Sequence, residues 1–328
     1  MKERAQTVPT QRTADKAQAP TTPPRFFELI PANTKIDFVR LAPRMVLLSS
    51  LFIVVGLVSM YLRGGLNYGI DFTGGTLVQV RFPQPTSISD VRAALDRPEA
   101  QGAVAQEIGR EGRDFQIRVS ETETGGAGEA VRAGLKEKFG EGAYDILKVE
   151  SVGPKVGRDL WRSATLAVLA STVMMGIYIA IRFDLRFGVG VAMALLHNVL
   201  FALAALSLAN LEFDLTTVAA LLTIVGFSVN DNVVISDRIR ENMRKMRRAD
   251  LATVLNVAIN ETLSRTIINS GTVIFVATAL FVLGGSVIHS FAFTLLVGFI
   301  IGTYSSIFVS TPIVLLLDRR RARPSRAA

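Results

Sequence analysis

The chain has 328 residues, a hydrophobic fraction of 49% and a mean hydropathy of +0.37, so it is too apolar for an ordinary soluble enzyme. It contains no cysteine, which excludes disulfides and thiol chemistry, and its two histidines disfavour a histidine-based metal site. A formal net charge of +8 could indicate a nucleic-acid partner, but the positions of the basic residues, given below, explain it without one. We therefore expect no cofactor, no metal and no nucleic-acid partner.

Six apolar runs follow a polar N-terminal tail that covers residues 1–44. The first 24 residues of that tail have too few apolar side chains to offset the entropy of ordering them, so we expect disorder there. About 20 apolar residues suffice to cross the ~30 Å hydrocarbon layer of a bilayer. The sequence therefore predicts transmembrane helices at residues 45–62, 163–181, 187–211, 215–236, 266–283 and 288–317.

The distribution of Lys and Arg predicts how these spans are oriented. The tail, the short segment 182–186, the basic loop 237–265 and the C-terminal tail 318–328 together carry 22 Lys and Arg against 10 Asp and Glu. The segments on the opposite side, 63–162 and 212–214, carry 14 against 17. Because basic segments stay in the cytoplasm, both termini are predicted to be cytoplasmic and residues 63–162 extracytoplasmic.

The external segment 63–162 has the composition of a small soluble domain. Residues Thr76 to Phe82 alternate like a half-buried strand, and Ser87 begins a capping box before a short helix at 91–95. Further strands are predicted at 103–108, 115–119 and 144–152, with a helix at 129–139. This β-α-β-β-α-β order is that of a ferredoxin-like domain. The predicted fold is thus an all-α membrane bundle of six transmembrane helices with a small α+β ferredoxin-like extracytoplasmic domain between helices 1 and 2.

Asp231 is the most informative residue, because it lies inside the fourth predicted span. A carboxylate there costs about 2.5–3.5 kcal/mol, so it needs a partner, water or a proton. Its neighbours Ser228, Asn230 and Asn232 are polar enough to hold water. Asp231 could merely hydrogen-bond a neighbouring helix, but we favour a functional role, since burial disfavours the charged form and makes protonation a natural switch.

Two other polar residues of the spans leave alternatives open. Arg265 opens the fifth span and could either extend to lipid phosphates or reach inward to Asp231, and spacing alone does not choose between these. His197 lies midway along the third span, where helix packing is favoured over a proton relay. The basic residues 237–248 form either a solvated connector or a surface near anionic membrane lipid or a partner.

The sixth span carries small residues at every fourth position, namely Gly298, Gly302, Ser306 and Ser310. These fall on one stripe of a helix and predict close packing against another helix.

Several motifs in order resemble those of the SecD/SecF family of protein-export membrane subunits. They are Gly69-Ile-Asp-Phe-Thr-Gly-Gly75 after the first span, Val152-Gly-Pro-Lys-Val-Gly157 before the second, the run from Gly226 to Asn242, and Glu261-Thr-Leu-Ser-Arg-Thr266. The likeness extends from about Thr34 to Asp318 and is closest to the SecF branch. Phe227 and Asn232 depart from the residues usual in the family.

The resemblance implies a bacterial inner-membrane protein with the fold of resistance-nodulation-division transporters, in which six helices form half of a twelve-helix unit. SecD would supply the other half, and the pair would work with the SecYEG channel. Proton flow would move the external domains and draw out an unfolded preprotein after the ATPase SecA has pushed it. The resemblance also implies that Asp231 is the proton-carrying carboxylate and that Arg265 is its basic partner.

Two other classes of function compete with this interpretation. A half-transporter for small molecules would need a larger external domain with a substrate cleft, and a passive assembly subunit would not need Asp231. An ATP-driven transporter is disfavoured, because the chain has no glycine-rich phosphate loop followed by Lys and Ser or Thr.

Overall fold

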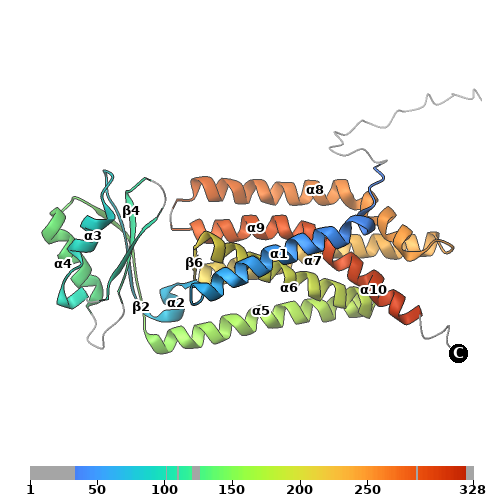
Figure 1. The fold of residues 1–328 in the computed structure, drawn as a ribbon, viewed down its shortest axis with the longest axis horizontal. Coiled ribbons are helices and arrows are strands. Elements are labelled where there is room, and N and C mark those ends of the chain that lie inside the picture. The colour runs from blue at the N-terminus through green and yellow to red at the C-terminus, as the bar shows by residue number, and fades with distance from the viewer. Residues whose placement is uncertain (1–33, 101, 109–110, 120–125, 286, 323–328) are drawn as a thin grey trace, which may run out of the picture.

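The computed structural model describes residues 34–100, 102–108, 111–119, 126–285 and 287–322. The predicted disordered tail and the end of the C-terminal tail, residues 323–328, lie outside the described residues. A long helical bundle has a small sheet-and-helix domain at one end, while α1 begins and α10 ends at the opposite end (Figure 1).

Six helical spans form the bundle, and each is long and apolar enough to cross a membrane. They are α1 (Phe38–Leu62), α5 (Pro154–Arg182), α6 (Leu185–Ala209), α7 (Leu215–Lys245), α8 (Leu251–Leu283), and α9 (His289–Ser305), which runs through a π-helix η2 (Ser306–Ser310) into α10 (Thr311–Ala322). The protein is therefore a multi-pass membrane protein, as predicted.

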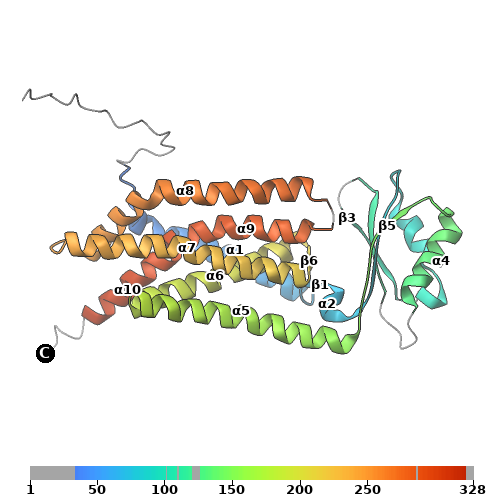
Figure 2. The ribbon, with the colours of Figure 1, turned by 180° about the vertical axis from the view of Figure 1, so that it is seen from behind.

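Three of these spans lie inside the bundle and three lie at its edge. More than half of the most apolar window is buried in α6, α7 and α9, but only 17% in α1, α5 and α8. Both ribbon views agree that α8 runs alongside the bundle with one broad side uncovered (Figures 1 and 2). The span that carries Asp231, α7, is thus one of the central helices.

The stripe of small residues in the sixth span brings α9 close to α7. A β-carbon built on Gly298 would lie 2.0 Å from Ile224 Cδ1, so only glycine leaves room for that side chain. Further along, Ser306 and Ser310 fall in the π-helix η2, where the Thr311 hydroxyl donates to the Ser306 carbonyl five residues earlier. Such an extra residue in a helical turn shifts the face that α10 presents.

The external domain between α1 and α5 is a four-stranded sheet with helices on one face. Its elements are β2 (Gly75–Arg81), α3 (Ile88–Ala94), a 3-10 turn η1 (Pro98–Ala100), β3 (Val104–Ile108), β4 (Asp114–Val119), α4 (Ala127–Phe139) and β5 (Asp145–Val152). The strands lie in the order β3-β4-β2-β5, and all neighbours are antiparallel. Val78, Phe115, Ile117, Val131 and Leu135 form the core between the sheet and α3 and α4. The predicted β-α-β-β-α-β order is the order observed.

The chain enters and leaves this domain through one tight junction. After α1, the residues Asn67–Tyr68 (β1) pair in parallel with Glu212–Phe213 (β6) in the turn between α6 and α7. The short helix α2 (Ile70–Thr73) follows and packs against the start of α5. Gly74 has a φ of +75°, and a β-carbon there would lie 2.9 Å from the Pro154 Cα, so both the turn and the close approach require glycine.

Candidate functional site

Asp231 lies near the middle of the 31-residue helix α7 with only 1% of its surface exposed. Its carboxylate faces α8, from which Ser270 Oγ donates to Oδ2 at 3.1 Å and Asn269 Nδ2 donates to Oδ1 at 3.4 Å. These two donors form charge-assisted hydrogen bonds to the carboxylate when it is ionised.

A second hydroxyl extends this cluster to α9. Thr303 Oγ1 donates to Ser270 Oγ at 2.6 Å, and it also contacts the Phe299 carbonyl of its own helix. Ser270 is buried and Thr303 is half-buried. The carboxylate is therefore held by a chain of side chains that joins α7, α8 and α9.

A cavity of about 640 Å³ adjoins the carboxylate, and α7 and α8 alone line it. Its walls carry Asn230, Asp231 and Arg265, together with Glu261 and Ser264 nearer the start of α8. Asn230 and Arg265 are exposed. A cavity with these polar walls can admit water to the carboxylate.

The pairing of Arg265 with Asp231 is not formed in this structure. Among the described residues Arg265 takes part in no ion pair, and the Asp231 carboxylate is bound by Asn269 and Ser270 instead. Arg265 precedes Asn269 by four residues, so it lies one helical turn further along the same face of α8. It shares the cavity with Asp231 without touching it.

Ser228 and Asn232 lie on a different face of α7 from the carboxylate. Ser228 Oγ accepts from Asn198 Nδ2 of α6 at 2.9 Å, and Asn232 Nδ2 donates to the Ser228 carbonyl at 2.8 Å. All three side chains are buried. Ser228 thus joins α6 to α7, Asn232 bonds the backbone of its own helix, and Asn230 lines the cavity.

His197 belongs to a third cluster, at the contact of α6 with α1 and α9. Its Nε2 lies 2.9 Å from Ser49 Oγ of α1, and its ring stacks on Tyr304 with the centroids 6.1 Å apart. The Tyr304 hydroxyl donates to the Met45 carbonyl at 2.5 Å. These contacts favour the packing role over a relay to Asp231.

The described residues contain no group of three or more His, Cys, Asp or Glu side chains arranged to hold a metal ion. The described side chains at the cavity supply the carboxylates of Asp231 and Glu261, hydroxyls, amides and the Arg265 guanidinium.

Sequence reasoning identified Asp231 but missed three residues that hold it, Asn269, Ser270 and Thr303. The pair Asn269-Ser270 is a visible interruption of the apolar run of α8 and could have been singled out. Thr303 carries no such signal, because a lone threonine in an apolar helix usually bonds its own backbone.

Comparison with known proteins decides the family. Residues 132–320 match the family described as "Protein export membrane protein SecD/SecF, C-terminal", and residues 64–86 match the "SecD/SecF GG Motif". The protein translocase subunit SecF of Magnetococcus marinus is 47% identical over 290 residues, covering 87% of this chain and 93% of the relative. The chain belongs to the SecD/SecF family.

Other relatives point to the same family. The SecF subunit of Gemmatimonas aurantiaca is 41% identical and covers 90% of this chain and 91% of its own length, and that of Escherichia coli is 39% identical with 84% and 85% covered. The crystal structure of SecDF from Thermus thermophilus superposes with a TM-score of 0.79 at 35% identity, and the match covers 89% of this chain. It covers 40% of the SecDF chain, so this member of the family spans less than half of that structure.

Both parts of the GG motif can now be placed. The Gly-Gly pair is the junction at which α2 ends and β2 begins, and Asp71 of the motif accepts from the Leu215 backbone N–H at the first turn of α7, at 2.8 Å. The motif therefore attaches the external domain to α7, the helix that carries Asp231.

Proposed function

We propose that the chain is the SecF-type half of a SecD–SecF unit in the bacterial inner membrane. In this proposal the unit uses the proton gradient to assist unfolded preproteins through the SecYEG channel, after SecA has pushed them. Asp231 carries the proton, and the external domain, which we assign to the ferredoxin-like class on its strand order, moves in response.

The observation that carries this proposal is the buried carboxylate of Asp231 beside a polar cavity. The two donors on α8 favour its ionised form, whereas burial favours its neutral form. A proton arriving through the cavity converts charge-assisted hydrogen bonds into weaker neutral ones. The preferred spacing of α7 and α8 then differs between the two states, which is a means of turning proton binding into helix movement.

The exposed polar groups on the α7–α8 face support pairing with a second membrane half. Arg265 and Asn230 are exposed on this side, and a bare guanidinium facing lipid tails is costly. A partner such as SecD would cover them and could offer Arg265 a counter-charge. The match to less than half of SecDF supports the same partner.

The orientation with both termini in the cytoplasm is supported by the distribution of charge. The ends of the described chain lie at the end of the bundle opposite the external domain (Figure 2), and the excess of Lys and Arg lies in the segments at that end.

Export by reconstituted membranes tests the proposal. Asp231→Asn and Arg265→Ala are each assembled with SecD and SecYEG in proteoliposomes, and SecA-dependent export is measured with and without a proton gradient. We expect both variants to co-purify with SecD but to lose gradient stimulation. Asp237→Asn is the matched control, since this exposed carboxylate lies on the same helix six residues later. The Asp237→Asn variant should retain gradient stimulation.

Retention of gradient stimulation by Asp231→Asn would overturn the proton role. The chain would then be better described as a passive assembly subunit, which is the main competing class.

A further inference from the structure

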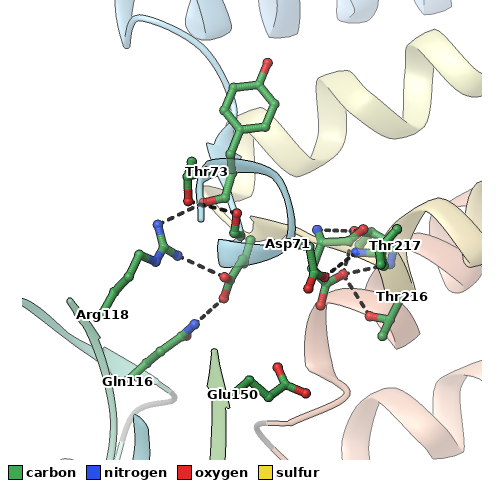
Figure 3. A network of polar contacts seen from close by, with 12 residues as sticks. Asp71, Thr73, Gln116, Arg118, Glu150, Thr216 and Thr217 are labelled. Atoms are coloured by element: carbon green, nitrogen blue, oxygen red, sulfur yellow. Dashed lines mark hydrogen bonds and ion pairs between the residues drawn. The ribbon is translucent and has the colours of Figure 1, made fainter. Parts of the chain in front are cut away.

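The external domain contacts the turn between α6 and α7 through the side chain of Glu212. Arg118 Nη2 donates to Glu212 Oε1 at 2.9 Å, and Gln116 Nε2 donates to Oε2. Arg118 and Gln116 project side by side from β4, and Arg118 also donates to the Tyr68 carbonyl at 2.8 Å (Figure 3). One carboxylate in the membrane part thus receives donors from two side chains of the sheet.

The rest of this interface is polar and hollow. The sheet face that carries Arg118 and Gln116 is the one without helices, and it also presents Gln79, Lys148 and Glu150 toward the bundle. A cavity of about 270 Å³ lies between this face and the outer ends of α6, α7 and α9. Most of the described residues that line this cavity are polar, apart from a few aliphatic side chains such as Leu77 and Ile108, so directed polar contacts contribute to how firmly the sheet is held.

Glu212 itself is firmly attached to α7. It is followed by Phe213, whose ring stacks on Phe72 of α2 with centroids 5.4 Å apart. Asp214 then caps α7 in a reciprocal capping box with Thr217. A displacement of the outer end of α7 therefore carries the Glu212 carboxylate with it.

The ion pair between Glu212 and Arg118 is largely shielded from solvent. The side chains of Glu212 and Arg118 are 17% and 26% exposed, so most of each lies inside the interface, where Glu212 also lines the cavity. By contrast, the ion pair of Arg81 with Asp114 joins two strands of the sheet at the end of β2, and Arg81 is 49% exposed.

We propose that Glu212 is a positioning residue that transmits movement of α7 to the external domain, through its contacts with Arg118 and Gln116. This inference rests on the proposed function, since it assigns the output of the proton-driven movement to one side chain. No comparison or family motif reported above assigns a role to Glu212.

The test measures domain position and function separately. The chain has no cysteine, so Lys136→Cys on α4 and Arg248→Cys in the loop before α8 can carry two spin labels, and both positions are exposed. Their distance distribution is measured in the complex with SecD. The variants are Glu212→Lys, which sets a cation against Arg118, Glu212→Gln, which keeps an acceptor oxygen, and the reversed pair Glu212→Lys with Arg118→Glu.

We expect a narrow distribution in the parent chain and a broad one in Glu212→Lys, with recovery in Glu212→Gln and in the reversed pair. Glu212→Lys should also lose gradient-stimulated export while proton uptake by the same proteoliposomes persists. A merely misfolded variant would lose both. Arg81→Gln, which breaks the surface pair, should match the parent chain in every measurement.

A narrow distribution in Glu212→Lys overturns the inference, and so does a broad one that leaves stimulated export intact. Failure of both Glu212→Gln and the reversed pair to recover the distance also overturns it. If the parent chain shows no gradient stimulation, the proposed function fails, and the distance measurement still decides whether Glu212 holds the domain.

Discussion

The hydroxyl of Ser270 occupies a special position at the residue scale, because it donates to Asp231 and accepts from Thr303. A hydrogen bond to a charged group contributes about 1.5–3 kcal/mol. Loss of the Ser270 hydroxyl therefore removes a large part of what favours the ionised carboxylate over the neutral one.

We predict that Ser270→Ala lowers gradient-stimulated export and proton uptake together, by about tenfold for a loss near 1.4 kcal/mol. Thr303→Val should lower export and proton uptake by a smaller factor, whereas Thr303→Ser, which keeps the hydroxyl, should leave both at the parent level. Thr278→Val is the control, since that exposed hydroxyl bonds only the Ile274 carbonyl of its own helix. Equal activity of Ser270→Ala and the control would refute the role of the cluster.

Glu212 gives a prediction for pH. Burial raises the pKa of this carboxyl above its ordinary value, and it outweighs the opposing effects of the hydrogen bond from Gln116 and the charge of Arg118. The neighbouring charges are Asp71 from α2 and Asp214 from the cap of α7, and the cavity adds Lys148 and Glu150 from β5, Glu107 from β3 and His289 from α9.

The sign follows from comparing the docked with the undocked domain. Undocked, Glu212 faces water and titrates near its ordinary pKa of about 4.3. The docked form has the higher pKa, so it binds the proton more tightly, and docking strengthens as pH falls through that higher value and weakens as pH rises above it. We predict that the spin-label distribution narrows on acidification from neutral pH. Glu212→Gln should show no such change, and a change of equal size there would point to another group.

Asp231 was predictable from sequence, because a carboxylate in an apolar run is costly and therefore conspicuous. Its true partners were not, since hydroxyls such as Thr223 and Thr278 occur in the same spans and bond only their own backbone. Which hydroxyl turns toward another helix depends on how the helices pack, and spacing alone does not determine that.

At the scale of elements, the approach of α9 to α7 depends on Gly298. The Ile224 side chain that fills the space is fully buried, so a β-carbon at position 298 would force it to shift within the core. We predict that Gly298→Ala destabilises the protein by about 1–3 kcal/mol, as over-packed cores do. A lower thermal midpoint in detergent would show it.

The combination with Ile224→Ala provides the check. The double variant should be less destabilised than the sum of the two single ones, because the added methyl enters the space that the truncation leaves. Gly271→Ala on α8 is the matched control, since a β-carbon there meets nothing within 4 Å. Additive effects would mean that α9 and α7 do not meet at this point.

Long elements were easier to predict than short ones. The apolar spans are long, repetitive signals, and β4 alternates between buried and half-buried residues. The strand β2 was predicted as half-buried but is buried on both faces, because one face packs on the domain core and the other faces the bundle. The two-residue strands β1 and β6 pair across 145 positions of sequence, Asn67 with Glu212, and no local pattern indicates such a contact. Glu212 therefore looked like an ordinary loop residue, although it lies at the junction of the two parts of the molecule.

At the scale of the whole molecule, the predicted orientation is open to a direct test. With single cysteines introduced into a chain that has none, Lys136→Cys in the external domain should react with a membrane-impermeant maleimide in intact spheroplasts. Arg248→Cys in the loop between α7 and α8 should react only after permeabilisation. The reverse pattern would place the termini outside and contradict the charge distribution.

The continuity of α7 has a mechanical consequence. This single helix carries the carboxylate near its middle and the capped turn at its outer end, and no break separates them. Asp231 lies 16 residues after Leu215, a distance of about 24 Å along the helix axis at 1.5 Å per residue. A tilt of ~5° about Asp231 would displace the outer end by ~2 Å, which is more than the range over which a hydrogen bond survives. In the proposed mechanism the helix would act as a lever arm, because a small tilt on protonation of Asp231 would be amplified into the making or breaking of a contact at its far end.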